Sequence, residues 1–230
     1  MSLSLPAGRY RRHALIGTAT CLVLLGALTL GVALGATDHL DVSAREHFRP
    51  DLTWGENQQS ANHVVFWLSP QRMALLLALG SAVVAAWRFT LWPLVQSALA
   101  VVAAGAVTLL LKVVVDRADP YGQHSGPGGS FPSGHSTMLL LCVGTGAMLI
   151  SCPTRWWQRI GLVTIEVVLA VAMLTVALHW LTDIVGGALV AAVVLGLEAL
   201  VAGSDGGPSH RGRRHHLRRR PRPPLARPVE

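Results

Sequence analysis

Six apolar segments, separated by polar or glycine- and proline-rich stretches, dominate the chain. They cover approximately residues 14–36, 70–87, 94–115, 136–150, 160–180 and 184–202. At 1.5 Å of helical rise per residue, about 20 residues cross a hydrocarbon core of about 30 Å. The pattern therefore predicts an all-α fold, a bundle of six transmembrane helices. Segment 136–150 is short for a full span, so we expect either that it starts inside the membrane boundary or that its preceding loop enters the membrane. Backbone at that depth needs the cover of protein or a water-filled cavity.

The composition also indicates a membrane protein. Of the 230 residues, 51% are hydrophobic and only 13% are charged, and the mean hydropathy is +0.46. An average soluble domain has roughly 25% charged residues. These values exclude a disordered chain, a coiled coil and a DNA-binding domain built on a soluble core.

The distribution of arginine predicts the orientation in the membrane. If the N-terminus is cytoplasmic, the inner side holds 14 basic residues and the outer side 5, or 6 against 5 without the C-terminal tail. Cytoplasmic loops carry the excess of basic residues, so we expect a multi-pass cell-membrane protein with both termini cytoplasmic. The first apolar segment exceeds the usual core of a signal peptide, about 7–15 residues, and we interpret it as an anchor.

We expect three parts along the chain. Residues 1–13 form a cytoplasmic N-terminal segment, 14–202 a six-helix membrane domain, and 203–230 a cytoplasmic tail. The tail is rich in arginine and proline, which predicts disorder and attraction to anionic membrane lipids. We do not expect it to bind nucleic acid. Residues 37–69 and 116–135 form outer loops, the first with room for an interfacial helix.

The first candidate chemical cluster leads into segment 136–150 and reads Phe-Pro-Ser-Gly-His-Ser-Thr over residues 131–137. A helix N-terminus presents free N–H groups and the positive end of the helix dipole, which together bind anions. Gly134 lets a phosphate approach the backbone, Ser133 adds a hydroxyl donor, and His135 is placed to transfer protons. Taken alone, these residues fit an ordinary serine N-cap beside a surface histidine equally well.

The second candidate cluster is His179 and Asp183, at the junction of segments 160–180 and 184–202. Four residues apart on a helix, they would share one face. Asp183 could then bind one ring nitrogen of His179, fix its tautomer and leave the other nitrogen as a nucleophile. An ionisable pair at membrane depth is costly and indicates function. The alternative is a purely structural hydrogen bond.

Lys112 is the only lysine of the chain and stands near the end of segment 94–115. It is either a point charge for phosphate or a cation that reaches the membrane interface. The three cysteines are scattered and follow neither a metal-binding nor a disulfide pattern. Beside His135, His179 and Asp183 the sequence offers no thiolate pair and no carboxylate-rich cage. We expect neither a metal site nor a cofactor.

Together these residues resemble the type 2 phosphatidic acid phosphatase superfamily, membrane lipid phosphatases related to vanadium haloperoxidases. The resemblance covers about residues 65–200. Its three motifs are similar to Lys112 with Pro120, to Pro132-Ser133-Gly134-His135, and to His179 with Asp183, which Gly186-Gly187 follow.

The resemblance implies a metal-independent hydrolase of a lipid phosphate or prenyl diphosphate, with its site near the extracytoplasmic face. His179 would attack phosphorus and form a phosphohistidine, Asp183 would orient His179, and His135 would protonate the leaving group. Lys112, Ser133 and the N–H groups around Gly134 would hold the phosphate oxygens. A prenyl carrier and a phospholipid head group suit an outward-facing site alike.

The chain departs from the family motifs at two positions. Asp119 stands where the first motif has arginine, and Ala172-Met173 stand where the third has Ser-Arg. The family arginines clamp phosphate, and each charge-assisted hydrogen bond contributes about 1.5–3 kcal/mol. Asp119 would repel phosphate, whereas Arg117 could replace one clamp, so we expect Asp119→Arg to raise turnover more than Met173→Arg. The alternative function is a weak or inactive family member that binds phospholipid or a membrane partner.

Overall fold

The computed structural model describes residues 7–50, 53–124, 128–150 and 156–204. Within these residues the chain forms eight α-helices and no β-strand, which confirms the predicted all-α fold. The helices are α1 (Ala7–Ala33), α2 (Asp38–Phe48), α3 (Glu56–Trp67), α4 (Pro70–Arg88), α5 (Trp92–Val115), α6 (Gly134–Ile150), α7 (Trp156–Thr175) and α8 (Leu181–Ser204).

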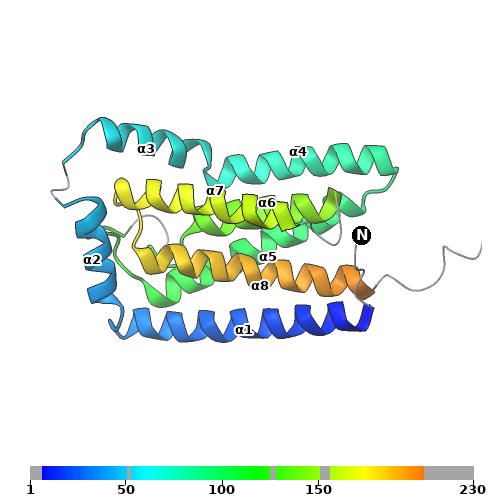
Figure 1. Cartoon of the computed structure of the whole chain (residues 1–230), viewed down its shortest axis with the longest axis horizontal. Coiled ribbons are helices and arrows are strands. Elements are labelled where there is room, and N and C mark those ends of the chain that lie inside the picture. The colour runs from blue at the N-terminus through cyan, green and yellow to red at the C-terminus, as the bar shows by residue number, and fades with distance from the viewer. Residues whose placement is uncertain (1–6, 51–52, 125–127, 151–155, 205–230) are drawn as a thin grey trace, which may run out of the picture.

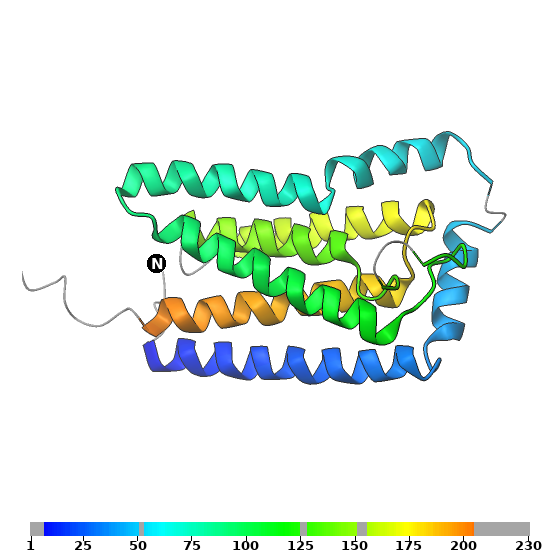
Figure 2. The ribbon, with the colours of Figure 1, turned by 180° about the vertical axis from the view of Figure 1, so that it is seen from behind.

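The helices form an elongated bundle, and α2 lies across one of its ends (Figure 1). Helix α1 packs on α8, α8 on α6, α6 on α4, and α3 on α7. Helix α5 packs on α4, α6 and α8, as the view from behind shows (Figure 2). The end crossed by α2 also holds the C-terminal ends of α5 and α7 and the N-terminal ends of α6 and α8.

Five helical stretches in the described part of the chain are long and apolar enough to cross a membrane. They are Arg11–Ala33, Glu56–Arg88, Trp92–Val115, Trp156–Thr175 and Leu181–Val201. Helix α6 is apolar but shorter, as segment 136–150 predicted. Large apolar side chains such as Val83 and Val102 are exposed, which is expected where lipid is the solvent. The chain is therefore a multi-pass membrane protein.

The predicted outer loop 37–69 contains helices α2 and α3, and α3 leads into α4. Helix α4 begins where the predicted segment 70–87 begins, with Ser69 as N-cap and Pro70 as the first helical residue. Proline lacks an N–H group and its ring clashes with a preceding helical turn, so Pro70 separates α3 from α4.

The predicted helix over 160–180 is wrong at its C-terminal end, because α7 stops at Thr175. The N–H of Leu178 donates to the carbonyl of Met173 at 2.9 Å, and that of Ala177 to Leu174 at 3.0 Å. Ala177 has a φ of 54°. This is a Schellman motif, in which the left-handed position is usually glycine. An alanine there gave no signal in the sequence, so the turn that reverses the chain towards α8 was missed.

The described helices extend into both predicted terminal parts. Helix α1 begins at Ala7, within the predicted segment 1–13, and α8 continues to Ser204. Residues 1–6 and the remainder of the predicted tail, 205–230, lie outside the described residues.

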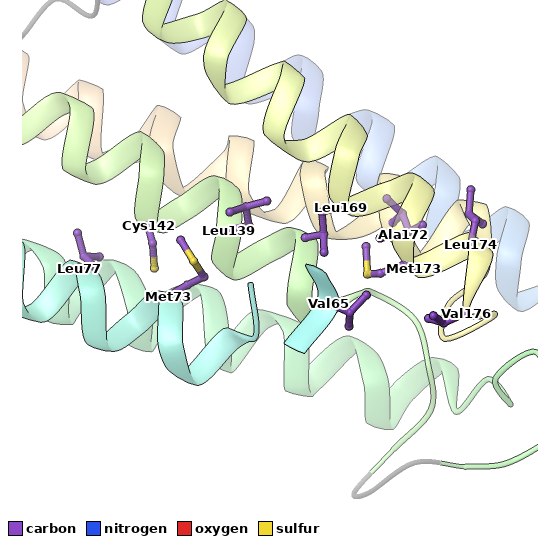
Figure 3. Close-up of a cluster of buried hydrophobic side chains, with 11 residues drawn as sticks. Val65, Met73, Leu77, Leu139, Cys142, Leu169, Ala172, Met173, Leu174 and Val176 are labelled. Atoms are coloured by element: carbon purple, nitrogen blue, oxygen red, sulfur yellow. The ribbon is translucent and has the colours of Figure 1, made fainter. Parts of the chain in front are cut away.

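Two groups of buried side chains hold the helices together. The larger joins α3, α4, α6, α7 and α8 (Figure 3); it consists of Val65, Met73, Leu77, Leu139, Cys142, Leu169, Ala172, Met173, Leu174, Val176 and Ile184. The smaller group joins α5, α6 and α8 and consists of Ala100, Ala104, Leu141, Ala191 and Val194. Its small residues allow a close approach of helix backbones, which is typical of membrane bundles.

Candidate active site

The predicted anion-binding residues lie at the N-terminus of α6, at the end of the bundle crossed by α2. Ser133 is fully buried, and its hydroxyl oxygen lies 3.5 Å from the N–H of Ser136 as an N-cap. Its carbonyl accepts from the backbone N–H of Thr137 at 3.1 Å. The N–H groups of Gly134 and His135 belong to the first turn, which has no acceptor within the helix. This end of α6 can therefore receive an anion.

Two glycines let α8 approach this motif closely. A Cβ atom on Gly187 would lie 2.4 Å from the carbonyl oxygen of Ser133, and one on Gly186 would lie 2.6 Å from the ring of Phe131. The carbonyl of Asp183 accepts a hydrogen bond from the N–H of Ser133 at 2.9 Å. The glycine pair after Asp183 therefore brings the two predicted motifs into direct backbone contact.

The two predicted catalytic histidines face each other. His135 lies in the first turn of α6, and His179 lies in the link 176–180 between α7 and α8. Their ring centroids are 6.1 Å apart, in an edge-to-face arrangement. His179 is 9% exposed, so its ring is largely shielded from solvent. One group bound between the two rings could contact both.

Asp183 lies behind His179 and is fully buried. Its Oδ2 atom is 3.4 Å from Nδ1 of His179 and accepts the backbone N–H of Trp180 at 3.1 Å. Asp183 is the third residue of α8, and Trp180 precedes the helix. The bond to Trp180 is therefore one half of a capping box. The pair is brought together by the capped start of α8, and not by one continuous helix.

Lys112 ties the loop before α6 to the end of α5. Its Nζ donates to the carbonyls of Gly129 at 2.7 Å and Ser130 at 3.1 Å. Cβ atoms on Gly128 and Gly129 would lie 2.7 Å and 2.1 Å from backbone atoms of Lys112 and Arg117. The glycines thus let the loop lie against α5, and Lys112 holds it there.

Arg117 contacts Asp183 at the carboxylate oxygen that is not directed at His179. One guanidinium nitrogen donates to Oδ1 of Asp183 at 3.1 Å and to the hydroxyl of Thr182 at 2.8 Å. The other donates to Oδ2 of Asp41 at 2.7 Å. The same nitrogen lies 3.6 Å from Oδ1 of Asp38, whose side chain is exposed. The structure therefore gives Arg117 three carboxylate partners, and its predicted role as a phosphate ligand stays a prediction.

The sequence reasoning missed Asp41, which is 1% exposed. It comes from α2, and its nearest partner in the site lies 76 residues away in the chain. An acidic residue near the start of a short helix is common, because it favours the helix dipole. The local pattern therefore carried no signal of a role in the site.

The two residues at the missing arginine positions have different surroundings. Oδ1 of Asp119 accepts the backbone N–H groups of Tyr121 and Gln123, each at 2.9 Å, so this carboxylate closes its own turn. Met173 is fully buried, and its sulfur lies 3.6 Å from the Ser133 hydroxyl oxygen. Of the two, Met173 is the one in contact with a predicted phosphate-binding side chain.

In the described part of the chain, no group of three or more histidine, cysteine, aspartate or glutamate side chains is placed to hold a metal ion. The structure brings together His135, His179 and the N-terminus of α6, and Asp183 contacts His179.

Two comparisons with known proteins concern the family and the fold. The model of the PAP2 superfamily matches residues 93–203, which contain almost all of α5 to α8. A crystal structure of a transmembrane PAP2-type phosphatidylglycerolphosphate phosphatase from Bacillus subtilis is similar, with a TM-score of 0.66 and 16% identity, over 82% of this chain and 94% of that chain. No curated protein matched the sequence.

Residues 93–203 therefore belong to the PAP2 superfamily, as the motifs had indicated. Over 82% of the chain, the fold is similar to that of a transmembrane PAP2-type phosphatase.

Proposed function

We propose that this protein hydrolyses a lipid phosphate or prenyl diphosphate at the extracytoplasmic face of the membrane through a phosphohistidine intermediate. The observation that carries the proposal is the relative placement of His135, His179 and Asp183. His135 and His179 face each other with ring centroids 6.1 Å apart, and Asp183 binds Nδ1 of His179 from behind. No metal ion or cofactor takes part.

In the first step, Nε2 of His179 attacks phosphorus and the bond from phosphorus to the leaving oxygen breaks. Asp183 keeps the proton on Nδ1, which leaves Nε2 free as the nucleophile and stabilises the cation that forms. His135 gives its proton to the leaving oxygen. The N–H groups at the start of α6 and the Ser133 hydroxyl stabilise the charge on the phosphoryl oxygens.

In the second step, His135 takes a proton from water, and the water oxygen attacks phosphorus. The bond between phosphorus and Nε2 of His179 breaks, which releases inorganic phosphate and restores both histidines. The same residue thus acts as acid and then as base, as microscopic reversibility requires.

The phosphate monoester of phosphatidylglycerol is the first substrate to test, because a PAP2-type phosphatase of that substrate has a similar fold. Phosphatidic acid and a prenyl diphosphate complete the panel. Phosphate release is measured with purified protein in detergent, for wild type, His179→Ala and His124→Ala. His124 is the matched control because its side chain is 51% exposed and pairs with Asp116.

We expect wild type and His124→Ala to release phosphate at similar rates and His179→Ala to lose about 10³-fold or more. Acid-labile, base-stable phosphate should appear on the wild-type protein and should be absent from His179→Ala. Activity should also survive EDTA. Loss of activity on chelation, with recovery on adding Zn²⁺ or Mg²⁺, would contradict the mechanism.

The second candidate function is binding of a phospholipid without turnover. It is favoured by the two missing arginines and by the engagement of Lys112 with two backbone carbonyls. Lipid-phosphate binding in wild type without phosphate release from any member of the panel would support it.

A further inference from the structure

Helix α2 contributes one carboxylate, that of Asp41, which contacts the start of α8. Oδ1 of Asp41 accepts the backbone N–H of Thr182 at 2.9 Å, and Oδ2 accepts the Thr182 hydroxyl at 2.6 Å. Thr182 is the second residue of α8, so this N–H has no acceptor within its own helix. Asp41 therefore caps the N-terminus of α8 from another helix.

Arg117 joins Asp41 to Asp183. Its guanidinium lies 2.7 Å from the first carboxylate and 3.1 Å from the second. Both carboxylates are fully buried, whereas the Arg117 side chain is 13% exposed. Its guanidinium carbon also lies 5.1 Å from the centre of the Trp180 ring. One cation therefore sits between two buried anions and satisfies both.

In this arrangement the two oxygens of the Asp183 carboxylate have different partners. Oδ1 is held by Arg117, and Oδ2 is directed at His179 and at the N–H of Trp180. We propose that Asp41 and Arg117 are positioning residues: Asp41 holds Arg117, and Arg117 holds Asp183 in the rotamer that binds His179. For its kinetic readout, the proposal rests on the phosphatase function proposed above.

A second contact, made by the C-terminal end of α2, supports a role for this helix in positioning the site. Arg49, which ends α2, donates through a guanidinium nitrogen to the carbonyl of Val176 at 2.6 Å. The hydroxyl of Tyr121 donates to the same carbonyl at 3.0 Å. Val176 begins the link that carries His179, so Arg49 contacts the start of this link and Asp41 contacts Thr182, two residues after its end.

The competing role for Arg117 is that of a phosphate ligand, and the two roles give different kinetics. A phosphate ligand acts on substrate directly, so its loss raises KM, and removing Asp41 frees it to bind more strongly. A positioning residue acts through His179, so its loss lowers kcat and leaves KM nearly unchanged. The loss of either member of the pair then has the same effect as the loss of both.

The experiment compares Asp41→Asn, Arg117→Met and the double variant, with Glu46→Gln as control. Glu46 is also an acidic residue of α2, but its side chain is 62% exposed. We expect kcat to fall about tenfold or more in each single variant and no further in the double variant. KM should stay within about twofold of wild type, and the control should match wild type. Each variant is first checked for a cooperative melting transition in detergent.

A measurement that does not depend on catalysis tests this proposal independently of the proposed function. Diethylpyrocarbonate modification of His179 is followed by mass spectrometry, with His124 as the internal reference. We expect Asp41→Asn and Arg117→Met to change the modification rate of His179 relative to His124, because the Asp183 contact is released. The same change in a protein that releases no phosphate would support the positioning pair and reject the phosphatase function.

Three results would overturn the proposal. They are a higher KM with unchanged kcat in Arg117→Met, additive losses in the double variant, and an unchanged His179 modification rate in both single variants. If Asp41→Asn or Arg117→Met does not fold, Asp41→Glu and Arg117→Lys are used. Each keeps the charge but changes the reach, and each should show a smaller loss of kcat with the same unchanged KM.

Discussion

The thioether sulfur of Met173 lies 3.6 Å from the hydroxyl oxygen of Ser133, between the C-terminal part of α7 and the start of α6. Both side chains are fully buried. In the family motif that this chain resembles, the position of Met173 is an arginine. A guanidinium at this position would therefore lie beside the end of α6 that we propose binds phosphate.

Met173→Arg should tighten the binding of inorganic phosphate and lower stability without it. An added charge-assisted hydrogen bond contributes about 1.5–3 kcal/mol, which is about tenfold or more in affinity. Without an anion, the buried cation should cost about 2.5–3.5 kcal/mol. Melting in detergent at increasing phosphate concentration measures both effects. Met173→Leu is the control, and an equal phosphate-induced shift in the two variants would contradict the placement of the site.

Asp119→Arg should lower stability and should not raise kcat/KM. Sequence reasoning ranked this change above Met173→Arg, but the carboxylate accepts two backbone N–H groups of its own turn. The net loss of one such hydrogen bond costs about 0.5–1.5 kcal/mol. Asp119→Asn keeps an acceptor oxygen and should stay near wild type. The melting temperature and kcat/KM of both variants test this, and a faster Asp119→Arg enzyme would show that the carboxylate acts on substrate.

Gly187→Ala should disrupt the site. Its Cβ would lie 2.4 Å from the Ser133 carbonyl oxygen and 3.0 Å from the Ser136 side chain, so α8 and α6 must separate. Overpacking of this kind costs about 1–3 kcal/mol, and displacement of Ser133 should also lower kcat. Gly105→Ala is the control, since its Cβ meets open space. Equal melting temperatures and rates for the two variants would mean that the helices do not approach as described.

Single-cysteine labelling of intact cells tests the orientation in the membrane. Glu46→Cys lies on exposed α2, at the end of the bundle with the histidines. Thr90→Cys lies in the exposed connection between α4 and α5, at the other end. With the three native cysteines replaced, an impermeant maleimide should label Glu46→Cys only. Labelling of Thr90→Cys alone would place the site on the cytoplasmic side.

Several features followed from the sequence because they depend on neighbouring residues. The apolar length of each segment predicted the helices, since a membrane span must satisfy its own backbone and face lipid. The residues at 132–135 were recognisable because N-cap, glycine and histidine act together within one turn. The four-residue spacing of His179 and Asp183 was enough to pair them, although the expected continuous helix is absent.

The remaining features depended on the tertiary structure, because they join residues far apart in the chain. Asp41 reaches Thr182 across 141 residues, and no local pattern marks a short-helix aspartate as a partner of a distant helix N-terminus. The direction of a long side chain was equally undetermined. Arg117 can turn either to substrate or to a carboxylate, and in the structure it contacts the buried anions Asp41 and Asp183. Packing determines which charged groups lie beside a buried cation. These partners of Arg117 could therefore be identified only from the tertiary structure.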